Sequence, residues 1–170
     1  MKSRVYIDNS VVSYLTARPR RDAVAAGRQI VTHEWWSTAS AQYEFVISDF
    51  VLEEAGAGDP RAAKLRLDAL AELLSVDIES VDIETLANAL IVGGALPMGA
   101  RFDALHIAAA ACNGIEFLVT WNYKHLASPE KLAFVEQVCD KLGYQAPRIV
   151  TPDQMLGAME PDNQGEPYEE

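Results

Sequence analysis

Polar residues stand where several predicted strands end or where the next helix begins. Asp8 ends the apolar run RVYI, and Asn122 follows the run FLVTW. The adjacent Glu53 and Glu54 come shortly after FVIS, and Asp103 lies in the first turn of the predicted helix ARFDALHIAAAACNG. Three carboxylates and an amide from distant parts of the chain are therefore candidates for one acidic site.

A set of converging carboxylates favours metal-dependent chemistry. Such groups repel one another and raise at least one pKa among them, so a hard divalent cation is their natural partner. Mg²⁺ or Mn²⁺ suits oxygen ligands, and such ions activate water, neutralise a phosphodiester oxygen and stabilise the leaving oxygen. The residue types therefore point to phosphodiester hydrolysis.

Strands that alternate with helices would bring these residues together. The hydrophobic period predicts short strands at 4–8, 45–48, 73–78, 117–121 and 148–151. Because parallel neighbours need crossover connections, the alternation predicts a three-layer α/β/α fold around a central, mainly parallel sheet of about five strands. Ligand chemistry in such sheets lies at the carboxyl ends of the strands, where helices running antiparallel to them begin. We therefore expect Asp103 beside Asp8.

The position of Asp8 at the end of a strand also fits roles that involve no metal. An aspartate after a strand can cap the next helix by accepting from its first amides, with Asn9 and Ser10 as further capping residues. Phosphoryl-transfer enzymes of haloacid-dehalogenase type also carry an aspartate there, but they need a second one two residues later, where this chain has Ser10. A nucleophilic Asp8 is therefore disfavoured, whereas capping and metal binding both remain open.

The composition is that of an ordinary folded domain. The chain has 170 residues, 49% of them hydrophobic and 23% charged, which favours a single domain, expected at 1–159. Five acids and no base lie in 160–170, which we expect to be a disordered tail. The net charge of −11 argues against broad electrostatic capture of nucleic acid. Residues 1–36 nevertheless hold six bases against three acids, so either a local basic surface or a solvated helix face is expected there.

Targeting and cysteine signals are weak. No run of about 18 apolar residues and no signal peptide is recognisable, so a cytoplasmic protein without a membrane association is expected. Cys112 and Cys139 have no metal-site or disulfide spacing, and we expect both to be buried and reduced.

The candidate residues resemble the ordered motifs of PIN-domain nucleases. The matching motifs are YIDNSVVSYL with Asp8, VISDFVLEEAGAGDP with Ser48 and Glu54, RFDALHIAAAA with Asp103, and FLVTWN with Thr120 to Asn122. The likeness is greatest to toxins of virulence-associated protein C (VapC) type from type II toxin–antitoxin pairs, and it runs from about Val5 to Leu156.

The resemblance implies a Mg²⁺- or Mn²⁺-dependent endoribonuclease. Asp8, Glu54 and Asp103 would hold the metal, and Asn122 would complete the catalytic set. Glu54 is preferred because it stands where the family's glutamate precedes a G-D-P turn, with Glu53 in reserve. The resemblance also implies an RNA substrate, a homodimer and a small antitoxin protein that blocks the pocket.

Asn122 departs from the family pattern, because many PIN nucleases carry an aspartate there. An amide can ligate a metal through its carbonyl oxygen, but it is no base and adds no charge. A non-catalytic PIN-like module that binds protein or RNA through a weakened metal site is therefore the alternative.

Three further residues are expected to support the site. The hydroxyls of Ser48 and Thr120 would position carboxylates or waters. His106 lies one turn after Asp103, where it would either contact phosphate or make a structural hydrogen bond.

Overall fold

A five-stranded sheet in which all neighbours are parallel forms the centre of the protein, in a computed structural model that describes residues 1–122 and 128–159. The strands are β1 (Arg4–Ile7), β2 (Glu44–Ile47), β3 (Leu74–Ser75), β4 (Phe117–Val119) and β5 (Arg148–Val150). Their order is β3-β2-β1-β4-β5, and Val5 pairs with Phe45 on one side and Phe117 on the other. The chain therefore adds β2 and β3 on one side of β1 and later adds β4 and β5 on the other side. This reversal makes the β1–β4 boundary a topological switch point.

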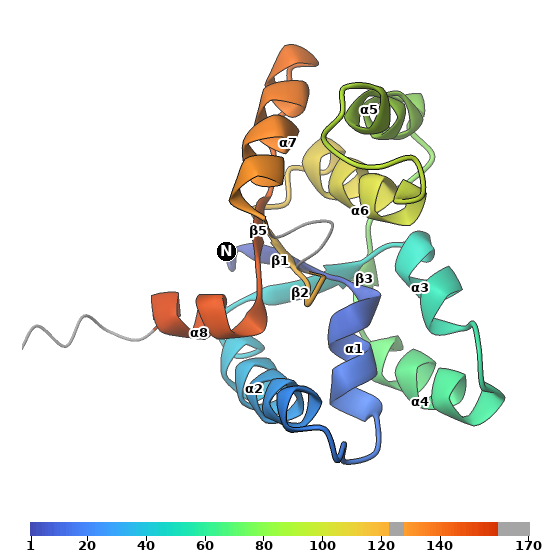
Figure 1. Ribbon diagram of the computed structural model, residues 1–170, viewed down its shortest axis with the longest axis vertical. Coiled ribbons are helices and arrows are strands. Elements are labelled where there is room, and N and C mark those ends of the chain that lie inside the picture. The colour runs from blue at the N-terminus through green and yellow to red at the C-terminus, as the bar shows by residue number, and fades with distance from the viewer. Residues whose placement is uncertain (123–127, 160–170) are drawn as a thin grey trace, which may run out of the picture.

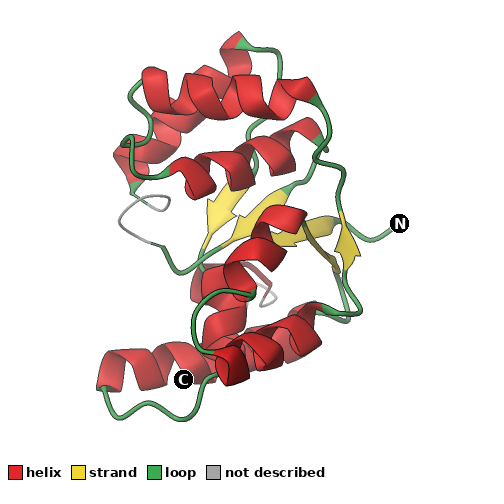
Figure 2. Ribbon diagram, turned by 90° about the vertical axis from the view of Figure 1, so that its right-hand side faces the viewer, coloured by secondary structure: helices red, strands yellow, loops and turns green. Residues whose placement is uncertain are grey.

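Helices cover both faces of the sheet (Figures 1 and 2). On one face lie α5 (Val81–Val92), α6 (Arg101–Cys112) and α7 (Pro129–Lys141). On the other lie α1 (Asn9–Thr16), α2 (Ala23–Ala39), α4 (Pro60–Leu70) and α8 (Pro152–Met159). The short α3 (Asp49–Ala55) contacts α1, α4 and α6, so it joins the two layers on one side of the molecule.

The central elements are apolar throughout because they are covered on both sides. The last three residues of β1 are fully buried, as expected for a parallel strand between two helix layers. In α6 every residue from 104 to 111 is buried, and most of these are alanines. Small side chains allow α6 to pack closely against α5 and the sheet, which fixes where the helix begins and therefore where Asp103 lies.

The predicted three-layer α/β/α fold is confirmed, with a sheet that is wholly rather than mainly parallel. The third strand is shorter than the predicted 73–78: it is an edge strand limited to Leu74–Ser75. The chain turns away soon afterwards, where the Asp77 carboxylate accepts a hydrogen bond from the Glu79 amide. The predicted acidic tail at 160–170 lies outside the described residues, and the boundary at 159 stays a prediction.

Within the described residues, no helix is both long and apolar enough to cross a membrane. Cys139 is buried as predicted, and Cys112 is only half-buried. Burial raises the pKa of the Cys139 thiol to about 11, so that thiol is neutral at ordinary pH.

Candidate active site

An acidic pocket of about 340 Å³ opens at the carboxyl edge of the sheet, where β1 and β4 end. The residues that line it are Asp8, Asn9, Ser10, Tyr14, Arg28, Glu54, Asp103, Trp121 and Asn122. These residues come from the ends of two strands and from α1, α2, α3 and α6. The predicted convergence of three carboxylates and an amide at this edge therefore occurs.

Asp8 caps α1 and is held by hydroxyl groups at the same time. Its Oδ2 accepts from the Ser10 amide at 3.2 Å, from Ser10 Oγ at 2.6 Å and from Thr120 Oγ1 at 2.9 Å. The other oxygen, Oδ1, lies 3.5 Å from His106 Nε2. One carboxylate oxygen is therefore fully engaged in fixing the side chain, which leaves Oδ1 as the better oxygen for a cation. The capping hypothesis for Asp8 is confirmed.

The end of β4 is tied to Asp8 through two hydroxyls. Thr120 Oγ1 accepts from the Asn122 amide at 3.0 Å while it donates to Asp8. Ser10 Oγ accepts from the Trp121 amide at 2.9 Å while it donates to the same carboxylate. Thr120 therefore positions a carboxylate, as its sequence context suggested. Ser10, expected only as a capping residue, shares that role.

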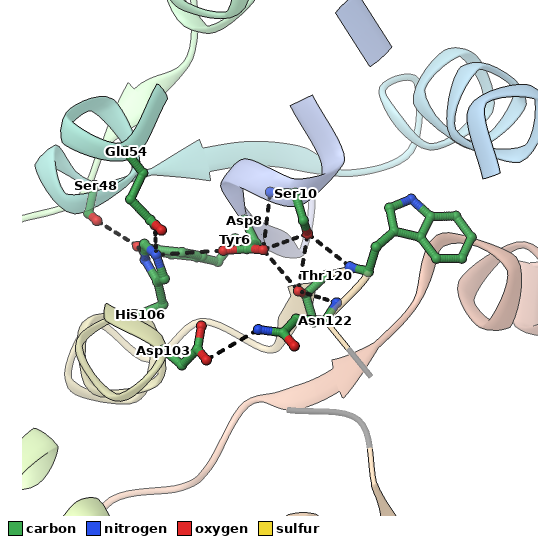
Figure 3. Close-up of polar contacts among 10 residues, drawn as sticks. Tyr6, Asp8, Ser10, Ser48, Glu54, Asp103, His106, Thr120 and Asn122 are labelled. Carbon is green, nitrogen blue, oxygen red and sulfur yellow. Dashed lines mark hydrogen bonds and ion pairs between the residues drawn. The ribbon is translucent and has the colours of Figure 1, made fainter. Parts of the chain in front are cut away.

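A buried row of side chains holds Glu54 from behind (Figure 3). Glu54 Oε1 and His106 Nε2 share a hydrogen bond, and His106 Nδ1 lies 2.7 Å from the Tyr6 hydroxyl. That hydroxyl lies 2.5 Å from Ser48 Oγ. His106, Tyr6 and Ser48 have no exposed surface, whereas the Glu54 side chain is 29% exposed. Glu54 is thus the end of the row that faces solvent.

The electrostatics of this row follow from its burial. Burial alone would lower the His106 pKa, but the hydrogen bond to Glu54 and the charges of Asp8, Glu54 and Asp103 outweigh it and raise that pKa. Burial raises the Tyr6 pKa well above its usual range, so the phenol stays neutral. With a protonated imidazole, His106 donates to both Glu54 and Tyr6, and the Tyr6 hydroxyl donates to Ser48. The polar side-chain atoms of Tyr6, His106 and Ser48 then all have a partner.

Asp103 lines the same pocket and contacts Asn122 there. Asn122 Nδ2 donates to Asp103 Oδ2 at 3.2 Å (Figure 3). Among the described residues, the ligand atoms that lie within 4.8 Å of one another belong to Asp8, Glu54 and His106. Asp103 therefore faces the pocket from α6, beside this tight cluster rather than within it.

The remaining predicted residues lie in different surroundings. Glu54 lines the pocket, while the reserve residue Glu53 is exposed on α3. His106 has no exposed surface, so it makes a structural hydrogen bond and a phosphate cannot reach it. Ser48 contacts Tyr6 rather than a carboxylate, so it could position Glu54 only through two intervening side chains, Tyr6 and His106.

Tyr6 and Arg28 are among the residues of the site that were missed from the sequence. Tyr6 precedes Asp8 by two positions, so the alternation of a strand places both on one face, and this spacing was the available signal. Arg28 lies far from every motif, within the basic stretch 1–36, and no local pattern marks it as a pocket residue.

A larger groove of about 700 Å³ lies between α1 and α4, but its chemistry is different. Four arginines line it, and its one acid among the described residues, Asp59, uses its carboxylate to cap α4 by accepting from the Ala62 amide. These residues offer no ligand set for a cation, so the smaller acidic pocket is the candidate active site.

The fold has a counterpart among solved structures. VapC20 of Mycobacterium tuberculosis, a toxin that cleaves the sarcin–ricin loop, matches 84% of this chain and 99% of its own, with a TM-score of 0.53 and 19% identity. The chain has a PIN-like fold. The resemblance inferred from the motifs is thus confirmed at the level of the fold. Comparison with models of protein families and with curated protein sequences found no match.

Proposed function

We propose that this protein is a Mg²⁺- or Mn²⁺-dependent endoribonuclease that hydrolyses RNA phosphodiester bonds in the acidic pocket and acts as the toxin of a toxin–antitoxin pair. The observation that carries the proposal is the convergence of Asp8, Glu54 and Asp103 in one pocket at the switch point of the sheet. The similar fold of VapC20, a toxin that cleaves the sarcin–ricin loop, supports RNA as the substrate.

The donor atoms fit a hard divalent cation. The pocket offers carboxylate oxygens, which Mg²⁺ and Mn²⁺ prefer, and the Asp8 oxygen that lies 3.5 Å from His106 is the one not used in capping. The nitrogen of His106 in this cluster is occupied by Glu54. Asp8 and Glu54 would therefore hold the ion, with Asp103 as a third carboxylate beside them.

The chain's own residues would position and protect the reacting groups. When bound, the cation supplies charge neutralisation at the phosphodiester and lowers the pKa of a water molecule. Ser10 and Thr120 fix the Asp8 carboxylate, and His106 fixes Glu54. Asn122 orients Asp103 through its amide nitrogen. Fixed carboxylates reduce the reorganisation needed during reaction, which is the main contribution that a protein makes to such chemistry.

Two adjacent glutamates of α3 give a matched test. Purified wild-type protein should cleave single-stranded or loop RNA with Mg²⁺ or Mn²⁺ and lose that activity in excess EDTA. Glu54→Gln should lower the cleavage rate by more than about 100-fold, because it removes a charged ligand. Glu53→Gln makes the same chemical change on the exposed face of α3 and should leave the rate unchanged. Full activity in EDTA, or equal rates in the two variants, would refute the proposal.

A non-catalytic binding module is the second candidate, and Asn122 is the observation that favours it. Its amide donates to Asp103, where a further carboxylate would add negative charge and draw a cation more strongly. An inactive module would bind Mn²⁺ weakly and bind RNA or protein without cleaving it. Asn122→Asp would then be the informative variant: gain of RNA cleavage absent from the wild type would establish the binding module.

The homodimer and the antitoxin partner belong to the same proposal. Expression of the wild type in cells without a partner should slow growth and cleave cellular RNA, and Glu54→Gln should do neither. Sedimentation of the purified chain measures the oligomeric state. Equal growth and intact RNA in both strains would argue against the toxin role. The cleavage assay with purified protein would still decide whether the protein is a nuclease.

A further inference from the structure

Arg28 is the one basic side chain among the described residues that line the acidic pocket. It comes from α2, on the face of the sheet opposite α6 (Figure 1). Its guanidinium carbon lies 5.3 Å from the centre of the Trp121 ring and 6.0 Å from that of Tyr14. Arg28 Nη1 also donates to the Tyr14 hydroxyl at 3.4 Å. The side chain is therefore held over two aromatic rings at an otherwise acidic site.

The aromatic wall under Arg28 is itself fixed. Trp121 is 6% exposed, and its indole nitrogen donates to Thr32 Oγ1 at 2.9 Å. Thr32 lies one turn after Arg28 on α2, and its hydroxyl donates to the Arg28 carbonyl at 2.6 Å. The Trp121 amide donates to Ser10 Oγ, which also holds Asp8. Trp121 and its hydrogen bonds thus position both the Arg28 guanidinium and, through Ser10, the Asp8 carboxylate.

An arginine held in this way is suited to a phosphate. Stacking on aromatic rings covers the faces of the guanidinium, while its N–H groups lie in the plane and match phosphate oxygens in pairs. The pocket is otherwise negative, so an RNA chain entering it needs a cationic contact beyond any bound metal. The carboxylates that would hold the metal come from the residue that follows β1 and from α3 and α6, whereas Arg28 approaches from α2.

We propose that Arg28, held by Trp121 and Tyr14, binds the RNA phosphate that flanks the scissile one. The inference rests on the proposed ribonuclease function and adds a phosphate subsite to its pocket. A contact to a flanking phosphate strengthens binding of substrate and transition state equally, so its loss raises KM and leaves kcat nearly unchanged.

Kinetics on a short single-stranded RNA test this subsite. Arg28→Met keeps the apolar length of the side chain and removes its charge, and KM should rise about tenfold to a hundredfold with kcat within about threefold of wild type. Arg28→Lys keeps the charge but lacks the planar guanidinium, so its KM should lie between those of the wild type and Arg28→Met. In a non-cleaving Glu54→Gln background, fluorescence anisotropy should show that Arg28→Met makes the slope of log affinity against log salt shallower by about 0.7.

Arg148→Met is the matched control. The Arg148 guanidinium also lies over an aromatic ring, with its carbon 5.3 Å from the centre of Phe117, but Arg148 begins β5 at the amino edge of the sheet. Its loss removes the same charge and the same stacking far from the pocket, so KM and the salt slope should stay at wild-type values. An equal rise in KM and an equal change in salt slope in Arg28→Met and Arg148→Met would reveal a general charge effect and overturn the subsite.

The remaining outcomes separate the subsite from a structural role and from the proposed function. A structural Arg28 would lower the melting temperature and the Mn²⁺ affinity of Arg28→Met together with kcat, which would overturn the inference. If EDTA and Glu54→Gln abolish cleavage but Arg28→Met retains wild-type KM, only the subsite is wrong. If the wild type binds RNA without cleaving it, the nuclease proposal fails and anisotropy still decides the subsite. A wild type that binds an acidic peptide but no RNA would overturn both.

Discussion

Asp8 serves two purposes that one substitution to alanine would confuse. It caps α1, and it presents an oxygen to the acidic pocket. Asparagine is as good an N-cap as aspartate and keeps an acceptor for Ser10 and Thr120, but it carries no charge. Asp8→Asn should therefore keep the free energy of unfolding within about 1 kcal/mol of wild type and lose Mn²⁺ binding. Asp8→Ala should lose both the helix cap and Mn²⁺ binding, and its free energy of unfolding should fall by about 2 kcal/mol or more.

Urea unfolding in EDTA measures the stability of the two Asp8 variants, and a calorimetric Mn²⁺ titration measures the site. Wild-type Mn²⁺ affinity in a folded Asp8→Asn protein would reduce Asp8 to a helix cap and move the metal to the other carboxylates.

Tyr6 gives a second prediction at the residue scale. Tyr6→Phe removes the hydroxyl that joins His106 to Ser48 and leaves two buried polar atoms without their partner. An unsatisfied buried group costs about 1–3 kcal/mol, and a freed His106 would hold Glu54 less firmly. Urea unfolding should show that loss, and Mn²⁺ affinity should fall about tenfold or more.

Tyr43→Phe is the control for Tyr6→Phe, because the half-buried Tyr43 has no side-chain hydrogen bond within residues 1–122 and 128–159. Its stability should change by less than about 0.5 kcal/mol. If Tyr6→Phe proves as harmless as this control, the buried row does not support Glu54.

The carboxylates of the site were predictable from the sequence, and their supports were not. Asp8 ends an apolar run, Glu54 comes shortly after one, and Asp103 lies in the first turn of a predicted helix, and each of these is a local signal. Tyr6 reads as one more apolar strand residue, because nothing nearby in the sequence announces that its hydroxyl meets His106, which lies 100 positions later. Hydrogen bonds of this kind depend on how the elements pack, and no short stretch of sequence determines that packing.

At the scale of elements, two glycines should respond in opposite ways to alanine. Gly27 lies inside α2, where an added Cβ would have no atom within 4 Å. Gly93 follows α5, where the same Cβ would lie 2.8 Å from the Ala89 carbonyl oxygen and 3.1 Å from a Val138 methyl of α7. Gly27→Ala should stabilise the fold by about 0.5–1 kcal/mol, because alanine favours helix, whereas Gly93→Ala should destabilise it by about 1–3 kcal/mol.

Thermal unfolding of the two variants measures that difference in sign. A stabilising Gly93→Ala would mean that α5 and α7 shift apart at little cost and that their contact is loose. A destabilising Gly27→Ala would mean that the exposed side of α2 is covered by another surface in solution.

Element types were easier to predict than element limits. The strand at 73–78 was expected from its apolar residues, yet β3 is limited to Leu74–Ser75 because the chain turns away at Asp77. A central strand such as β1 is held from both sides, and its limits followed closely from its apolar run.

At the scale of the whole molecule, the order of the strands was the main feature that the sequence did not supply. Alternating helices and strands predict layers and parallel pairing, but strands of two to four residues carry no pattern that distinguishes their neighbours. The reversal at β1 is nevertheless what brings Thr120, which directly follows β4, beside Asp8, which directly follows β1. The arrangement of the candidate site at this edge therefore depends on a property of the sheet as a whole.

The net charge of −11 sets the last prediction, because added cations can stabilise this protein in two ways. Any salt screens the repulsion among its acidic groups, whereas an ion bound only by the folded state adds a free energy that grows with its concentration. Mg²⁺ at about 100 times its dissociation constant should add about 2.7 kcal/mol and raise the melting temperature by about 5–10 °C over NaCl of equal ionic strength. Glu54→Gln should lose this extra gain, while Glu53→Gln, which makes the same charge change, should keep it. Equal gains in all three proteins would mean that Mg²⁺ acts by screening alone and that the acidic pocket is not a metal site.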